Sequence, residues 1–258
     1  MTRPPAAARV LLASALSAAA LWSAACSAEG RPAPRPASES APSTSAAAPP
    51  APSPAALTAA QAEAALVTPA DLGEPWVPTR GAATWRDEML KGSTDDPDCR
   101  RLLDVLYTEE LLGAPAGARA VAALDDDGSG AQLHYQVAAH RPADVDRAVA
   151  WLASLPGRCG EFTATTVRGT EAHAEVTEVA LPEAGDARAG VRVVVAAQTA
   201  DGEQAYVTVE AAVVRVGDDA ITLTHGGYGD LDTEVTRAAV ELGARRLTDI
   251  RQRGRALV

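Results

Sequence analysis

The sequence lacks the residue patterns that identify common hydrolases, and it has few residues from which a catalytic site could be built. No HExxH and no GxSxG motif occurs, and the 258 residues include only four histidines and three cysteines. The four histidines are scattered along the chain, so no short motif unites them. A nucleophile with its base and orienting residue is not recognisable, so we expect a protein that is not an enzyme and that uses no cofactor.

Basic residues are scarce as well. The chain has 23 lysines and arginines against 34 aspartates and glutamates, a formal net charge of −11 at pH 7. Such an acidic surface repels phosphate backbones, so we do not expect nucleic acid as a partner. Lys91 is the only lysine and alanine is abundant, a composition that is typical of G+C-rich genomes and indicates an actinobacterial source.

Long hydrophobic runs are absent except near the start of the chain. Arg3 and Arg9 precede the apolar segment VLLASALSAAALW, which is 13 residues long. A basic end followed by a short apolar run is the order of an export signal, and the run is too short for a membrane-spanning helix. We therefore predict that residues 1–25 are a signal peptide.

Small residues precede Cys26, and this stretch resembles the lipobox of bacterial lipoproteins. In that family the cysteine receives a diacylglycerol on its sulfur and becomes the first residue of the mature chain. The resemblance implies lipidation at Cys26, membrane contact through that lipid, and a location on the outer face of the cytoplasmic membrane. The alternative is ordinary cleavage near Ala24 or Ala28, which leaves a free thiol that is unusual in an exported protein.

Residues 26–56 comprise this cysteine and a segment made almost entirely of Ser, Ala and Pro. The segment has no large apolar side chain, so burial cannot offset the entropy of folding. We expect a disordered tether that reaches up to roughly 90 Å at about 3.1 Å per residue. The remaining residues, 57–258, are enough for one domain with a sizeable core.

The other two cysteines form an even pair once Cys26 carries a lipid. Cys99 and Cys159 are then left in an oxidising compartment, where cysteines pair readily. We predict one disulfide between them. It would close a loop of about 60 residues, worth roughly 4 kcal/mol in the chain-entropy model.

The first part of the predicted domain mixes helix and strand patterns. Thr58 and Gln61 have the spacing of a capping box at a helix start. A second helix begins near Cys99, with leucines 102, 103 and 106 as its apolar stripe. Residues 131–140 alternate apolar and polar side chains, which predicts a strand with one buried face.

A further helical pattern starts after this strand and ends at Pro156 and Gly157. The second half then reads as a meander of five strands, and a last amphipathic helix follows. The five strand segments are residues 161–169, 173–181, 191–200, 204–217 and 220–225. This order predicts an α+β domain, an antiparallel β-sheet packed on one face by helices.

Two turns carry alternatives that bear on a binding site. The acidic segment LDDDGSG does not have the spacing of an EF-hand, so we interpret it as a solvated turn. The turn at Gly217 has two possible registers: a two-residue loop places Glu210 opposite His225, and a three-residue loop places Ala211 there. The sequence does not choose between them.

The order of these elements resembles the extracellular sensor domain of PknH-type receptor kinases. The motifs that carry the resemblance are AALVTPADLGEPW, DCRRLL, GRCGEF, AAVVRVGDDAITLT and the amphipathic C-terminal helix, spread over residues 57–252. The resemblance implies a cleft for an extracellular ligand, and the domain also occurs in actinobacterial lipoproteins without a kinase. The kinase member carries two disulfides, whereas this chain has cysteines for one. It also lacks the Gly-rich loop, HRD and DFG motifs of a kinase.

We therefore expect a lipid-anchored, non-catalytic domain that binds an unknown small ligand or an envelope protein. The candidate ligand-binding residues are Tyr135, Arg215 and His225, which lie on predicted strands. We predict no metal site, although His134 and His225 with a carboxylate form one alternative. Two other functional classes stay open: a structural or protein interaction module of the envelope, and a cryptic hydrolase.

Overall fold

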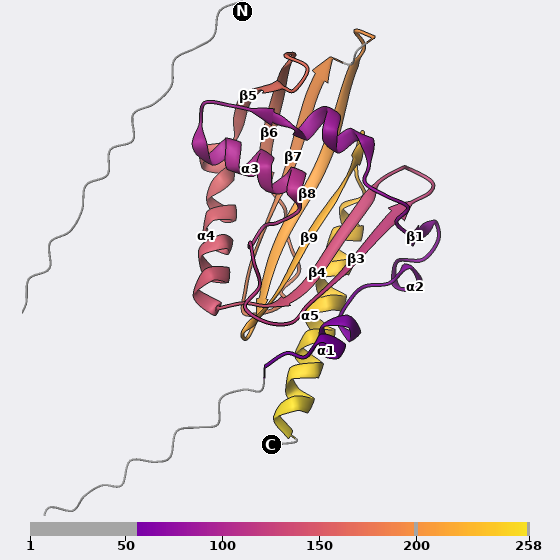
Figure 1. Cartoon of the computed structure of the whole chain (residues 1–258), viewed down its shortest axis with the longest axis vertical. Coiled ribbons are helices and arrows are strands. Elements are labelled where there is room, and N and C mark those ends of the chain that lie inside the picture. The colour runs from indigo at the N-terminus through magenta and orange to yellow at the C-terminus, as the bar shows by residue number, and fades with distance from the viewer. Residues whose placement is uncertain (1–55, 199–200, 257–258) are drawn as a thin grey trace, which may run out of the picture. The chain divides into compact units, whose positions relative to one another are not determined.

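The computed structural model describes residues 56–198 and 201–256. The predicted signal peptide, Cys26 and nearly all of the tether lie outside the described residues. Within the described part, one sheet of nine strands has the order β1-β3-β4-β9-β8-β7-β6-β5-β2, and every neighbouring pair is antiparallel (Figure 1). Together with five α-helices this makes the α+β architecture that the sequence predicted.

The long strands lie in the centre of the sheet, and the shortest two form its edges. The strands are β1 (Trp76–Pro78), β2 (Gly92–Ser93), β3 (Arg119–Asp126), β4 (Gln132–Ala139), β5 (Glu161–Thr166), β6 (Glu171–Glu178), β7 (Ala187–Gln198), β8 (Gln204–Val216) and β9 (Asp219–Tyr228). Short edge strands limit the number of unpaired backbone groups at each end of the sheet.

The helices differ widely in length. They are α1 (Ala59–Ala64), α2 (Pro69–Leu72), α3 (Pro97–Thr108), α4 (Pro142–Arg158) and α5 (Thr233–Ala256), with one π-helical turn, η1 (Arg86–Leu90). The predicted capping box is present at α1, where Thr58 and Gln61 bond each other's backbone amides. None of the helices in the described part is both long enough and apolar enough to span a membrane.

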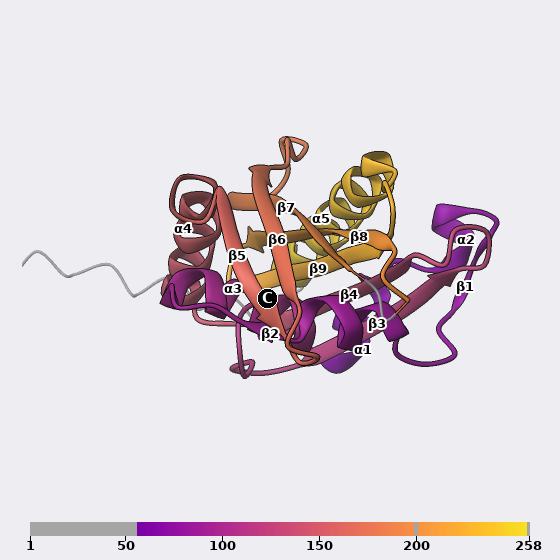
Figure 2. The ribbon, with the colours of Figure 1, turned by 90° about the horizontal axis from the view of Figure 1, so that it is seen from above.

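Helices cover both faces of the sheet, so the prediction of one covered face was wrong. The face under η1, α3 and α4 is called the α4 face here, and the face under α1 and α5 is called the α5 face (Figure 2). β8 gives the reason, because it is apolar on both sides. Val209 and Val213 belong to the core of the α4 face, and Ala212 and Val214 belong to that of the α5 face.

β4 corrects a second prediction from the sequence. Leu133, Tyr135 and Val137 are buried on the α5 face, as the alternation predicted. Gln132 and Gln136, on the opposite side, are also buried. A strand with polar residues on alternate positions is therefore covered on both faces here, and the side chain of Gln132 finds its partners in other segments.

The cover over β4 on the α4 face comes from residues 79–118, which we call the crossing segment. β1 and β2 are close in sequence but lie at opposite edges of the sheet. The chain therefore runs across the sheet from β1 through η1 to β2, and it returns through α3 to β3 (Figure 1). This route brings η1 and the end of α3 to the α4 face.

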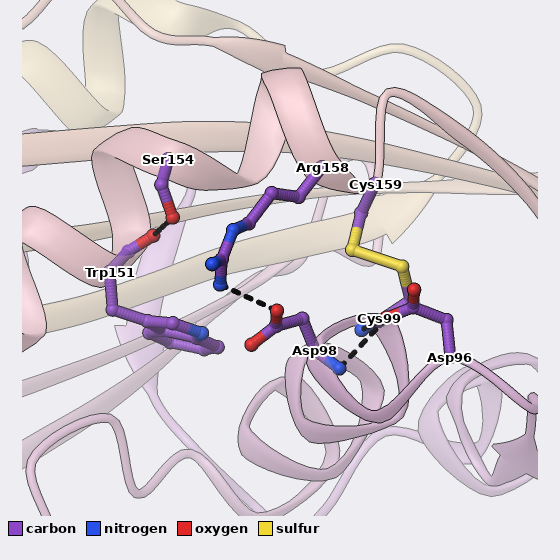
Figure 3. Close-up of a disulfide and its surroundings, with 7 residues drawn as sticks. All are labelled: Asp96, Asp98, Cys99, Trp151, Ser154, Arg158 and Cys159. Carbon is purple, nitrogen blue, oxygen red and sulfur yellow. Dashed lines mark hydrogen bonds and ion pairs between the residues drawn. A yellow bond between two sulfur atoms is a disulfide. The ribbon is translucent and has the colours of Figure 1, made fainter.

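The predicted disulfide between Cys99 and Cys159 is confirmed. It joins the first turn of α3 to the residue that ends α4, with 5.6 Å between the two Cα atoms (Figure 3). α4 continues through Pro156 to Arg158, slightly beyond the predicted end. Arg158 also pairs with Asp98 at 2.6 Å, so a covalent bond and an ion pair hold α3 and α4 together.

The two turns are now defined. β3 extends to Asp126, which then accepts hydrogen bonds from the amides of Gly128 and Ser129. The acidic segment is therefore a turn only after Asp126, because Asp125 and Asp126 pair with β1 as part of the strand. At the other turn, Val216 pairs with Asp219, which leaves a two-residue loop that begins at Gly217. Gly217 has a φ of 62°, a conformation that glycine adopts readily.

Candidate functional site

A cavity of about 240 Å³ lies on the α4 face, where the crossing segment passes over β3 and β4. The polar residues of its wall are Thr79, Arg86, Glu109, Gln132 and His134. Larger hollows, up to about 420 Å³, lie elsewhere on the described surface. The cavity under the crossing segment differs from them because one wall combines a buried cation, a carboxylate on a residue with a strained backbone, and a histidine.

Arg86 supplies the buried cation. It lies on η1, next to Trp85, in a segment whose apolar residues pack against the sheet. Only 5% of Arg86 is exposed. Its guanidinium donates to the carbonyl oxygen of Leu106 at 3.1 Å, pairs with Glu109 at 2.5 Å and lies 4.7 Å from the centre of the Trp85 ring. Burial lowers the pKa of Arg86 and Glu109 opposes the shift, so the ion pair keeps this charge inside the protein.

Glu109 supplies the carboxylate, and its backbone is strained. It ends α3 with φ 61° and ψ 17°, and among the described residues no other non-glycine has a positive φ. A left-handed conformation in such a residue costs on the order of 1 kcal/mol and is often found at functional sites. The Oε1 atom accepts a hydrogen bond from Thr224 at 3.1 Å in addition to the ion pair, which fixes the strained residue in place.

Gln132 holds the crossing segment over the cavity. Its side-chain oxygen accepts from the amide of Ala83 at 3.1 Å, and its side-chain nitrogen donates to the carbonyl of Gly81 at 2.6 Å. The same nitrogen donates to Asp125 at 2.8 Å. The wall of the cavity is therefore built by side-chain bonds between β4 and an irregular segment, which a strand pattern alone does not reveal.

His134 completes the wall and is half-buried. Within the part of the chain that the structure describes, neither of its ring nitrogens makes a hydrogen bond to the protein. Burial lowers the pKa of His134 below its ordinary value, with Glu109 acting in the opposite direction. The ring is therefore neutral near pH 7, with one nitrogen able to donate and one able to accept a hydrogen bond.

The three residues that the sequence offered as ligand contacts are placed elsewhere. Tyr135 is fully buried on the α5 face, and its hydroxyl group lies so close to Gly243 that a Cβ there would clash. Arg215 pairs with Asp146 at 2.8 Å, beside α4. His225 is 1% exposed. The structure does not bring the three together at one cavity, and their role in binding stays a prediction.

His225 belongs to a closed polar network on the α5 face, in which only the Oε2 atom of Glu210 is buried without a hydrogen bond to the described protein. The two-residue loop places it opposite Glu210, as the first of the two registers requires. Glu210 is fully buried; it pairs with Arg192 at 3.0 Å and accepts a hydrogen bond from Thr233 at 2.9 Å. His225 itself bonds Thr236 of α5 through Nδ1 at 3.2 Å.

The structure excludes the alternative metal site. His134 pairs with Thr224, the neighbour of His225 in β9, so the two histidines point to opposite faces of the sheet. The described residues contain one group of three possible metal ligands, formed by Asp96, Cys99 and Cys159. Its two sulfur atoms form the disulfide, so they are not available as thiolate ligands.

Sequence reasoning missed Arg86, Glu109 and Gln132 as site residues. In the sequence, Arg86 is one charged residue in the stretch TWRDEML, and Glu109 is one of two consecutive glutamates. Neither has a spacing that suggests a site. The one available signal was that a glutamate, not a glycine, follows the apolar stripe of α3 at the position where helices often end in glycine.

Comparison with solved structures gives matches that include a structure of the kind that the sequence motifs resemble. The extracellular domain of PknH from Mycobacterium tuberculosis is similar to the chain at 13% sequence identity and a TM-score of 0.47. The similarity covers 78% of this chain and 100% of that one. No protein-family model and no curated protein sequence matches the chain. A likeness at this level carries no argument about function, which has to come from the residues of the cavity.

Proposed function

We propose that the folded part of this chain is a non-catalytic, sensor-like domain that binds a small polar ligand in the cavity at Arg86 and Glu109. The observation that carries the proposal is the combination of groups in that wall. They are a buried cation, the carboxylate of a residue with a strained backbone, and a histidine whose ring makes no hydrogen bond to the described protein. Groups of this kind around a concave space are the usual mark of a ligand site.

The test is a thermal-shift screen of the purified full-length protein against envelope metabolites, sugars and amino acids. A ligand that binds only the folded state raises the melting temperature by mass action. We expect at least one small polar compound to raise it, and we expect His134→Gln to reduce that rise. If the compound raises the melting temperature of His134→Gln and of Glu109→Gln as much as that of the wild type, the ligand binds elsewhere and the proposal is refuted.

We further propose that Cys26 carries a lipid that anchors the chain to the outer face of the cytoplasmic membrane. The support is the sequence alone: a short apolar run, small residues before the cysteine and a Ser/Ala/Pro segment after it. Metabolic labelling with a clickable palmitate analogue should mark the wild-type chain. Equal labelling of Cys26→Ala would contradict this assignment.

A second candidate function is binding to an envelope protein. A hollow of about 410 Å³ lies over β5, β6 and β7, and Glu161, Glu175 and His173 contribute to its lining. The two carboxylates favour a basic partner. The test is crosslinking in cells, which should capture one discrete envelope protein, and Glu161→Lys should abolish that capture. If this is found and no small compound shifts the melting temperature, binding to an envelope protein replaces the first function.

A further inference from the structure

We propose that the ligand of the cavity is a small zwitterion with one carboxylate and one ammonium group, of the size of an α-amino acid. The inference rests on the proposed function of the same cavity. It follows from the charges in the wall, from the bonding capacity those charges still have, and from the volume.

The wall presents both signs of charge within one ion pair. Arg86 and Glu109 lie 2.5 Å apart at their closest atoms, and both line the cavity. An anion that approaches Arg86 also meets the carboxylate of Glu109, and a cation that approaches Glu109 also meets Arg86. A zwitterion can place each of its charges beside the opposite one, so it avoids both repulsions.

Both members of the pair retain bonding capacity. The Nη2 atom of Arg86 is buried and makes no well-aligned hydrogen bond, although it lies close to Glu109. A guanidinium has five N–H groups, and the contacts to Gln132, Leu106 and Glu109 do not use all of them. The described bonds of Glu109 all go to Oε1, which leaves Oε2 for an ammonium donor.

The other polar groups of the wall are neutral and add directional contacts. His134 is a neutral ring whose two nitrogens make no hydrogen bond to the described protein. It can donate to a ligand carboxylate or accept from a ligand ammonium group. Because buried charges lose their hydration, a ligand with both charges matched is favoured over one that leaves a charge unpaired.

The volume limits the size of the ligand. Sites for drug-sized molecules occupy about 300 to 1,000 Å³, whereas this cavity measures about 240 Å³. A molecule with few heavy atoms is enough to fill this space. Small amino acids combine this size with the two required charges.

The experiment compares four kinds of test compound by calorimetry on the purified full-length protein. The zwitterions are glycine, L-alanine and L-serine; propionate carries only the negative charge, L-alaninamide only the positive charge, and erythritol neither. We expect the best zwitterion to bind at least tenfold more tightly than the other three kinds. Propionate or L-alaninamide binding as tightly as L-alanine would overturn the inference, as would the absence of binding by every zwitterion at millimolar concentration.

Variants separate this inference from the proposed function. Glu109→Gln should weaken zwitterion binding at least tenfold, whereas Glu110→Gln, which removes the same charge from the exposed neighbour, should leave it unchanged. His134→Gln serves as a second site variant if Glu109→Gln fails to fold. If erythritol alone binds and both site variants weaken it, the ligand class is wrong and the cavity stands. If L-alanine binds equally to all variants, the cavity is not the site and both proposals fail.

Discussion

The two faces of the sheet use the same kinds of side chain in opposite ways. On the α5 face, His225 lies opposite Glu210 and bonds Thr236, so the polar groups there are enclosed and largely joined to one another. On the α4 face, one residue position away in the β4–β9 pairing, His134 lines a cavity and makes no hydrogen bond to the described protein. Each face thus carries a histidine, a carboxylate and an arginine.

The difference lies in what covers each face. α5 is one continuous helix of 24 residues, and its first turns bring Thr233 and Thr236 onto the sheet as partners for the polar groups. The crossing segment over the other face changes structure along its length, from a π-helical turn to a short strand and then to α3. It leaves space between its side chains and the sheet. A closed polar network points to a structural role, and an open one beside a cavity points to a ligand.

The largest predicted effect comes from removing the disulfide, which should destabilise the α4 face more than the α5 face. Cys99 anchors the start of α3, and Glu109 ends that helix. We expect Cys99→Ala with Cys159→Ala to lower the free energy of unfolding by about 4 kcal/mol, because the unfolded chain loses a constraint on a loop of 60 residues. Denaturant unfolding measures this loss.

Hydrogen exchange then shows where the loss acts. We expect faster exchange in α3 and the crossing segment, and little change in α5, which the disulfide does not touch. Uniformly faster exchange over both faces would mean that the two faces open together, and the contrast between them would be lost.

The next effect is a pH dependence to which His225, in the closed network, should contribute most among the histidines. Burial lowers the pKa of His225 to about 4 from an ordinary value of 6.5. The unfolded chain therefore binds a proton at this position before the folded chain does as the pH falls. The contribution of His225 to the free energy of unfolding should fall between pH 6.5 and pH 4, by about 3 kcal/mol in full.

The variant His225→Gln lacks this contribution, so over the same range the wild type should lose about 3 kcal/mol of unfolding free energy relative to the variant. Asp219, whose pKa burial raises to about 6, contributes with the opposite sign below that pH, but it is present in both proteins and cancels in the difference. Parallel pH profiles of wild type and variant would show that His225 is not the group responsible.

The smallest predicted effect is a matched pair of substitutions at neutral pH. His225→Gln removes an enclosed ring that bonds Thr236 and lies 5.7 Å from the Trp76 ring, so we expect a loss of about 2 kcal/mol. His134→Gln removes a ring without a hydrogen bond to the described protein, and we expect a loss under about 1 kcal/mol. Equal losses in denaturant unfolding would remove the distinction between the two sites.

Local sequence patterns predicted many of the elements because those patterns depend on near neighbours. The capping box at Thr58, the leucine stripe of α3 and the β8–β9 hairpin each need only a few adjacent residues. The pairing of Cys99 with Cys159 followed from the number of cysteines and the expected compartment. The register at Gly217 was left open, because both loop lengths suit the same residues and only packing of the whole strand selects one.

The candidate site was not predictable in the same way. Arg86 and Glu109 are 23 residues apart, and Gln132 and His134 come later still. Their meeting depends on the path of the crossing segment from one sheet edge to the other and back. Apart from the glutamate at the end of α3, nothing in the local pattern of these residues distinguishes them from solvated side chains, so the sequence interpretation favoured residues on strands instead.

By itself, the sequence determined the types of most elements, the α+β class and the disulfide partners, because periodicity, capping and cysteine number act over short distances or by simple counting. Only the tertiary structure decided which faces of the sheet are covered and which polar residues meet. Both outcomes depend on the order of strands in the sheet, which brings residues far apart in the chain into contact. That order places His225 under α5, where Thr236 bonds its ring, and it places His134 beside a cavity, where its ring makes no hydrogen bond to the described protein.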